Sequence, residues 1–284
     1  MSNAILLLSC PDQPGLVAAV ANFVFENGGN IVHAAQHTDH ERGVFFQRVE
    51  FETSKFRIPD REISQAFEPI RARFGMEMSI GFPKEKRRVA ILASKEGHCL
   101  YDMLFRLRMG ELHAEVPLVI SNHPDHESAV KFFGHEFRYL PVEPGKKAEQ
   151  ERQVLELLAA EKIDLVVLAR YMQILSGEFI RAYPMKILNI HHSFLPAFVG
   201  AKPYHQAYER GVKLVGVTAH YATEVLDEGP IVEQDVVRVT HRDSIGDLIR
   251  KGRDLEKAVL ARAVRAHLEH RILVYGNKTV VFGV

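Results

Sequence analysis

DLVVLA, residues 164–169, is an unbroken apolar run in which polar and apolar side chains do not alternate. A strand of this composition is buried on both faces, which is typical of a parallel sheet with helices packed on each side. The preceding sequence repeats the pattern. Strands are expected at 89–93 and 116–121, and helices at 98–108, 125–133 and 146–161. The later part of the chain therefore predicts an α/β fold with a Rossmann-like, mostly parallel sheet.

Sheets of this class bind ligands at the carboxyl ends of their strands. One such end is expected in KILNIH, residues 186–191, where an apolar segment becomes polar. Residues two apart in a strand share a face, so Asn189 and His191 should project together. A further strand at 214–220 leads into a loop that carries Asp227 just before a Glu-Gly-Pro turn. These residues are candidates for one site.

The three side-chain types suit attack on a carbonyl carbon. The Asn189 amide and a protonated His191 can donate hydrogen bonds to the oxyanion, and one well-placed donor lowers such a barrier by about 3 kcal/mol. Asp227 can hold an imidazole in one tautomer or take a proton from the nucleophile. Taken singly, His191 also fits a core or surface histidine and Asp227 a turn residue. Their combination with His220, at the end of the second strand, favours a site.

The first part of the chain has a different pattern. Strands and helices are expected in the order βαββαβ at 4–9, 14–27, 30–38, 44–51, 60–74 and 76–82. This order predicts an antiparallel, ferredoxin-like sheet with both helices on one face. The basic run PKEKRR is short and begins with proline, so it is more typical of a solvated linker than of a nucleic-acid patch. The expected domains are residues 1–83 and 89–284, with a linker at 84–88.

Composition argues against several classes of protein. Lysine plus arginine and aspartate plus glutamate are balanced at 36 each, so no overall basic field attracts nucleic acid. No apolar run approaches the roughly 18 residues that span a membrane. Cys10 and Cys99 lie far apart, which fits a reducing, cytoplasmic setting. The histidines form no HExxH set, and the adjacent His191 and His192 would face opposite ways in a strand, so no metal site is expected.

Three segments together resemble the folate-dependent formyltransferase family. They are NIHHSFLP at 189–196, HYATEVLDEGPIVEQ at 220–234 and ARYMQIL at 169–175. The resemblance implies that Asn189, His191 and Asp227 are catalytic, and that His220 and Thr223 line the same site. It also implies that the pteridine of a folate binds the backbone around Tyr221–Asp227 and a loop made by Arg170, Tyr171, Met172, Gln173, Ile174 and Leu175.

Members of that family differ in the group that accepts the formyl. Transfer to glycinamide ribonucleotide needs a glycine-rich phosphate loop after the first strand, and here SKEGHC, residues 94–99, has one glycine and the acidic Glu96. Transfer to methionyl-tRNA needs a substantial C-terminal domain, whereas only a short tail follows the last expected helix, 244–269. Water is the expected acceptor, and transfer to glycinamide ribonucleotide or another amine is the alternative.

The segment SCPDQPGLVAAVANFVFENGGNI, residues 9–31, resembles an ACT domain. An ACT domain ahead of a formyltransferase core, together with the loop FVGAKPYHQA at 198–207, is similar to the formyltetrahydrofolate deformylase family. That resemblance implies hydrolysis of 10-formyltetrahydrofolate to formate and tetrahydrofolate, with the folate as substrate and no cofactor. It further implies a cytoplasmic enzyme that supplies formate for purine synthesis and balances one-carbon folate pools.

The ACT resemblance also implies regulation within a homo-oligomer. Glycine or methionine would act as the effector, with Asp12, Gln13, Gly15 and Asn30 as the binding residues. An ACT domain that only dimerises the protein and binds nothing fits the sequence equally well. A catalytically silent amino-acid sensor is a further alternative, and the presence of all three catalytic residue types argues against it.

Overall fold

The computed structural model of the chain describes residues 3–197 and 203–283. The chain divides into two compact units, one made of Met1–Lys86 with Glu269–Val284 and the other of Arg87–Leu268. The expected linker at 84–88 lies at this division. The expected second domain, 89–284, differs from the observed unit, because residues 269–284 group with the N-terminal unit. Within the 198–207 loop, residues 198–202 lie outside the described residues.

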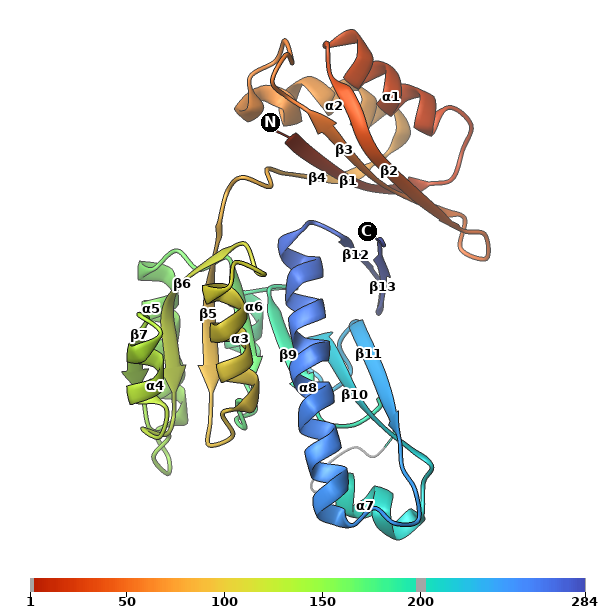
Figure 1. Ribbon diagram of the computed structural model, residues 1–284. Coiled ribbons are helices and arrows are strands. Elements are labelled where there is room, and N and C mark those ends of the chain that lie inside the picture. The colour runs from red at the N-terminus through yellow and green to blue at the C-terminus, as the bar shows by residue number, and fades with distance from the viewer. Residues whose placement is uncertain (1–2, 198–202, 284) are drawn as a thin grey trace. The chain divides into compact units, whose positions relative to one another are not determined.

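The first unit has the βαββαβ order that the sequence predicts (Figure 1). Its elements are β1 (Asn3–Pro11), α1 (Leu16–Glu26), β2 (Asn30–Asp39), β3 (Val44–Glu52), α2 (Ile63–Phe74) and β4 (Glu77–Gly81). The strands form one antiparallel sheet in the order β2-β3-β1-β4. Both helices cover one face of it (Figure 1). The ferredoxin-like arrangement is confirmed.

Strand β1 contributes to the core on both faces of this sheet. Leu6 and Leu8 pack in the cluster that contains Val20 and Phe23 of α1. Leu7 belongs to a separate cluster that contains Phe46 of β3. Because neighbouring residues of a strand point to opposite faces, both sides of the sheet bury apolar surface.

The second cluster is completed by a C-terminal hairpin, β12 (Ile272–Tyr275) and β13 (Lys278–Val281). Tyr275 packs on Phe46 with 4.5 Å between the ring centroids. Phe282 is buried in the same cluster. The expectation of a short tail misses this hairpin, because two strands of four residues carry too little periodicity to be recognised.

Replacing Phe46 with alanine tests this packing. Phe46→Ala should destabilise the first unit by about 3–5 kcal/mol, because it empties a fully buried ring site. The amides at 272–281 should also exchange hydrogen faster. Phe25→Ala, which removes an exposed ring of α1, is the control and should change stability by less than about 0.5 kcal/mol. Denaturant unfolding measures both variants, and equal losses would contradict the packing described here.

The second unit is built around a seven-stranded sheet with the order β11-β10-β9-β8-β5-β6-β7. Its strands are β5 (Arg87–Ala93), β6 (Ala114–Ser121), β7 (Glu136–Tyr139), β8 (Leu165–Ala169), β9 (Ile187–His191), β10 (Leu214–Tyr221) and β11 (Ile231–Arg238). Its helices are α3 (His98–Arg108), α4 (Glu127–Phe132), α5 (Lys147–Ala160), α6 (Gly177–Ala182), α7 (Pro203–Arg210) and α8 (Ile245–Leu268). Strands β5 to β9 pair in parallel, and β10 is antiparallel to both neighbours. The mostly parallel sheet is confirmed.

Helices cover both faces of this sheet. α3 and α8 pack together, and α8 contacts β9, β10 and β11 (Figure 1). α5 and α6 pack on the other face, where Leu158 and Phe179 join Leu168 of the DLVVLA strand in one core cluster. Every residue of β8 is buried, as its composition predicts.

The sequence expectations omit β7, α6, α7 and β11. The first three are only four, six and eight residues long, so no period stands out. β11 lies at the edge of the sheet and carries three consecutive polar residues, Glu233 to Asp235, which interrupt the alternation. Within the described ranges, no helix has the length and apolarity needed to cross a bilayer.

Candidate active site

The antiparallel pairing of β9 with β10 sets the centre of the site. Asn189 pairs with His220, and His191 pairs with Thr218. The Asn189 amide nitrogen lies 3.1 Å from His220 Nε2, and His220 Nδ1 lies 3.0 Å from the Tyr221 carbonyl oxygen. Because a carbonyl only accepts, His220 carries its hydrogen on Nδ1 and accepts from Asn189 through Nε2. This pair of bonds fixes the orientation of the Asn189 amide.

Asp227 reaches the same point from the loop after β10. Its backbone is left-handed, with φ of 58°, a conformation that aspartate tolerates better than most residues. Two residues later, a β-carbon on Gly229 would lie 1.7 Å from the Tyr221 carbonyl oxygen. The Tyr221 N–H donates to the Pro230 carbonyl at 3.0 Å. Glycine is therefore required for the turn that returns Asp227 to the sheet.

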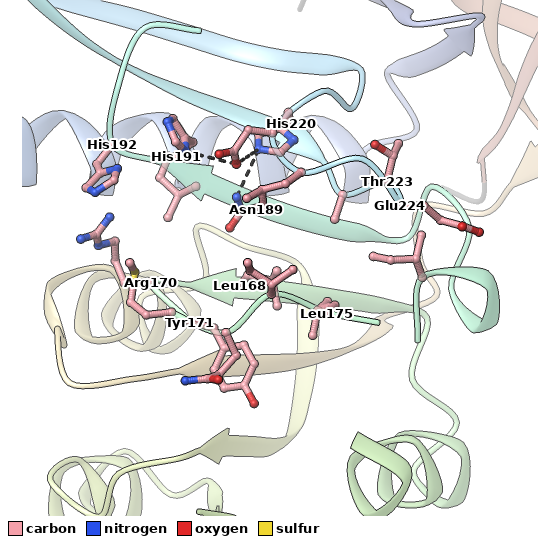
Figure 2. A pocket seen from close by; sticks show the side chains of 18 residues that line it. Leu168, Arg170, Tyr171, Leu175, Asn189, His191, His192, His220, Thr223 and Glu224 are labelled. Atoms are coloured by element: carbon pink, nitrogen blue, oxygen red, sulfur yellow. Dashed lines mark hydrogen bonds and ion pairs between the residues drawn. The ribbon is translucent and has the colours of Figure 1, made fainter. Parts of the chain in front are cut away.

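His191 is held between Asp227 and Ser193. Its Nδ1 lies 3.2 Å from Asp227 Oδ1, and its Nε2 lies 2.8 Å from Ser193 Oγ. The Ser193 hydroxyl donates to the Ala197 carbonyl at 2.9 Å, so its oxygen accepts from His191. Each ring nitrogen of His191 thus faces an acceptor, which suits the ring with a hydrogen on both nitrogens. The contacts join Asn189, His191 and Asp227 in one cluster (Figure 2).

The surrounding groups set the charge of this cluster. Burial would raise the pKa of the Asp227 carboxyl, but the hydrogen bond from His191 and the charges of His191, His220 and His192 outweigh it and hold the pKa below its ordinary value. Burial lowers the pKa of His220 and outweighs the opposing effects of the Tyr221 carbonyl and Asp227. At neutral pH the site therefore contains an Asp227 carboxylate beside a neutral His220.

The cluster lines a cavity of 410 Å³ (Figure 2). The folate loop expected from the sequence lines it in full, with His220 and Thr223: Arg170, Tyr171, Met172, Gln173, Ile174 and Leu175. This loop is fixed by polar contacts. The Met172 N–H donates to Ser94 Oγ at 2.9 Å, and Lys147 donates to the Ile174 carbonyl. Apolar walls with a few convergent polar groups are typical of a small-molecule site.

The expected 221–227 segment also lines the cavity, through Ala222, Glu224 and Leu226 as well as Thr223 and Asp227. Sequence reasoning missed four other lining residues: Leu168, Ile180, Ile190 and His192. His192 follows the last residue of β9, so strand alternation does not turn it away. Its ring lies edge-on to His191 with 5.2 Å between centroids. The expectation that the two histidines face opposite ways is wrong, because both line the cavity. Burial, followed by the charges of Arg170 and His191, lowers the pKa of His192 to about 4.

The sequence analysis also did not predict Glu256, a buried carboxylate of α8. An acidic residue in the buried row of an amphipathic helix is the signal that identifies such a position.

Donor atoms of His98, Cys99 and Glu256 lie within 4.8 Å of one another. Arg170 Nε lies 3.3 Å from the same carboxylate. A cation is thus already present there, which disfavours a metal ion among these donors.

The residues expected to bind an effector do not all meet within one chain. Asp12, Gln13 and Gly15 share the exposed loop before α1. Asn30 begins β2 and pairs with Glu52, at one end of β3. The loop follows β1 at the opposite end of that pairing. The structure therefore groups the first three residues and separates them from Asn30.

Comparisons with known proteins account for both units. Residues 87–264 match the family described as formyl transferase, and residues 4–56 match the ACT domain. A protein of Synechocystis sp. named formyltetrahydrofolate deformylase is 57% identical over 280 residues, covering 99% of this chain and 98% of the relative. The chain belongs to the formyltetrahydrofolate deformylase family.

Solved structures agree with membership of the deformylase family. A formyltetrahydrofolate deformylase from Pseudomonas syringae pv. tomato has 49% sequence identity and a TM-score of 0.97, covering 100% of this chain and 95% of that chain. Glycinamide ribonucleotide transformylase 1 from Symbiobacterium toebii has 33% identity and a TM-score of 0.67, but covers only 70% of this chain. The deformylase match thus extends over the whole chain, and the transformylase match does not.

The low pKa of His192 makes stability depend on pH. The unfolded chain protonates this ring below about pH 6.5 and the folded chain only below about pH 4, so acid favours unfolding between these values. Lowering the pH from 7 to 5 should therefore destabilise the wild-type protein by about 2 kcal/mol more than His192→Gln. Guanidinium unfolding at both pH values measures this. An equal loss in the two proteins would contradict a neutral, partly buried His192 ring.

Proposed function

We propose that this protein hydrolyses 10-formyltetrahydrofolate to formate and tetrahydrofolate. The observation that carries the proposal is the convergence of Asn189, His191 and Asp227 on a cavity whose other wall is the 170–175 loop. The full-length similarity to proteins named formyltetrahydrofolate deformylase supports it. In this arrangement the pteridine lies against the loop and the formyl carbon faces the three polar side chains.

The reaction begins with a water molecule held by Asp227. The carboxylate orients the water or takes its proton as the oxygen attacks the formyl carbon. The oxyanion that forms accepts a hydrogen bond from the Asn189 amide, and a protonated His191 beside it stabilises the negative charge. Collapse breaks the bond to the folate nitrogen, which takes a proton from an imidazole or from water. Formate keeps the formyl oxygen and gains one oxygen from water.

The proposed reaction uses no cofactor, because the folate is the substrate and the side chains supply the polarisation. In the cell, the formate released would supply purine synthesis, and the reaction would balance the one-carbon folate pools. We assign the enzyme to the cytoplasm, in keeping with two buried, unpaired cysteines.

Contacts at the 94–99 loop support water as the acceptor over a ribonucleotide. Glu96 is exposed enough to repel a phosphate and is ion-paired with Arg253 at 2.7 Å. The Ser94 carbonyl accepts from His126 at 2.8 Å, and the Ser94 hydroxyl donates to Asn122 at 2.7 Å. The loop therefore presents a phosphate with a carboxylate and with a serine hydroxyl that already donates to Asn122, in place of a glycine-rich backbone cradle.

The first unit would carry regulation in this proposal. Glycine or methionine would bind at the loop of Asp12, Gln13 and Gly15, and a second copy of the chain would have to supply any contribution from Asn30. This suits a homo-oligomer. A silent amino-acid sensor is disfavoured, because the polar cluster of the second unit is fully assembled around Asp227.

Replacing Asp227 with asparagine tests the role of the carboxylate. Asp227→Asn keeps the shape of the side chain but removes the charge that holds the water, so kcat should fall at least about 1000-fold. The Kd for tetrahydrofolate should change less than about threefold. Asp235→Asn, which alters a carboxylate on β11 that pairs with Arg262, is the control and should keep near-normal turnover. Substantial turnover by Asp227→Asn would refute the assignment.

The identity of the acceptor is tested by omitting every amine. Formate should be released from 10-formyltetrahydrofolate in buffer alone, and glycinamide ribonucleotide should neither accelerate the reaction nor become formylated. Formate and tetrahydrofolate should appear in equal amounts. A strict requirement for the ribonucleotide would point to the transferase alternative.

A further inference from the structure

Glu256 is a buried carboxylate that the proposed reaction does not use. Its side chain is 2% exposed, although it projects from a helix otherwise packed through apolar residues. A buried charge is retained only where partners compensate it. We propose that Glu256 is a positioning residue that fixes Arg170, and with it the start of the folate loop, for substrate binding. This inference rests on the proposed function for the identity of the substrate.

Three elements of the second unit converge on the Glu256 carboxylate. His98, the first residue of α3, donates from Nε2 to Oε2 at 2.8 Å. The Tyr204 hydroxyl of α7 donates to Oε1 at 2.8 Å. Arg170, which follows β8, places Nε 3.3 Å from Oε2. Burial would raise the pKa of Glu256, but His98, Arg170 and Tyr204 outweigh it and hold the pKa below its ordinary value. The carboxylate is therefore ionised and compensates Arg170.

Arg170 depends on this partner more than an ordinary surface arginine would. Its side chain is 12% exposed, and its backbone is left-handed with φ of 62°. Within residues 3–197 and 203–283, its buried Nε has no hydrogen-bond partner, so the contact with Glu256 is an ion pair and not an aligned hydrogen bond. Without Glu256, a buried cation in a strained backbone would be left uncompensated and would move into the cavity.

The same carboxylate also supports the histidines of the site. The Tyr204 ring lies edge-on to His192 with 6.1 Å between centroids, and His192 lies edge-on to His191 at 5.2 Å. Figure 2 shows the Arg170 guanidinium directed toward His192. Glu256 thus contacts both Arg170, at the start of the folate loop, and Tyr204, whose ring packs against His192.

Glu256→Gln in the full chain tests the proposal. The KM for 10-formyltetrahydrofolate and the Kd for tetrahydrofolate, measured by calorimetry, should each rise about tenfold, while kcat should change less than about threefold. Leu260→Ala, one turn along α8, is the control for lost stability and should leave the Kd unchanged. A Kd for Glu256→Gln within about twofold of the wild-type value would overturn the proposal.

A double-mutant cycle separates positioning from a general structural effect. In an Arg170→Met background, Glu256→Gln should change the Kd less than about twofold, because the effect acts through the arginine. Persistence of the full tenfold effect would overturn the proposal. Tyr204→Phe removes one donor but keeps the ion pair, so a Kd within about twofold is expected, and a tenfold rise would also overturn it. The Kd needs no turnover, so failure of the wild-type protein to release formate would contradict the proposed hydrolysis alone.

Discussion

The contact between His191 Nδ1 and Asp227 Oδ1, 3.2 Å long, is the interaction on which the site depends. It joins His191, at the end of β9, to Asp227 in the loop that follows β10, and so holds that loop against the sheet. Three features that cost free energy accompany this contact. They are the left-handed backbone of Asp227, the close approach at Gly229, and the removal of two ionisable side chains from most of the solvent, since His191 and Asp227 are only 7% and 10% exposed. Strain of this kind persists only where the surrounding structure over-determines it. Here the Asp227 carboxylate is held by the neighbouring imidazoles, and the His191 imidazole is held by Ser193 as well.

The sheet makes this contact possible because strand direction changes between β9 and β10, near one edge. Strands β5 to β9 run in parallel and bring Arg170 and His191 to one edge, where such sheets bind ligands. The antiparallel β10 then sets His220 opposite Asn189. A neutral His220 orients the Asn189 amide without adding a charge, and Asp227 supplies the carboxylate that contacts His191. The fold thus places His220 to orient the Asn189 amide and Asp227 to contact His191.

The sequence predicted the elements with strong periods and failed where local signals are weak. DLVVLA and the βαββαβ order are long, regular patterns, and both are confirmed by the sheets. The strand alternation that groups Asn189 with His191 stops at the end of β9, and so it could not reveal that His192 lines the same cavity. Glu256 acts across more than 80 residues of sequence, a contact that only tertiary structure creates. The C-terminal hairpin was missed because its strands have only four residues each, and its packing on Phe46 is likewise a contact that only tertiary structure creates. Asn30 was grouped with Asp12 by the resemblance to an ACT domain, whereas the sheet places the two at opposite ends of β3 within one chain.

Hydrolysis by water activated beside Asp227 is the central claim, and oxygen labelling tests it most directly. A single turnover of 10-formyltetrahydrofolate in water enriched in oxygen-18 should yield formate that carries one labelled oxygen, because water supplies one oxygen and the formyl group supplies the other. Mass spectrometry of the formate measures the label. Formate without the label, or no formate in buffer alone and a formylated product when an amine is added, would contradict the account.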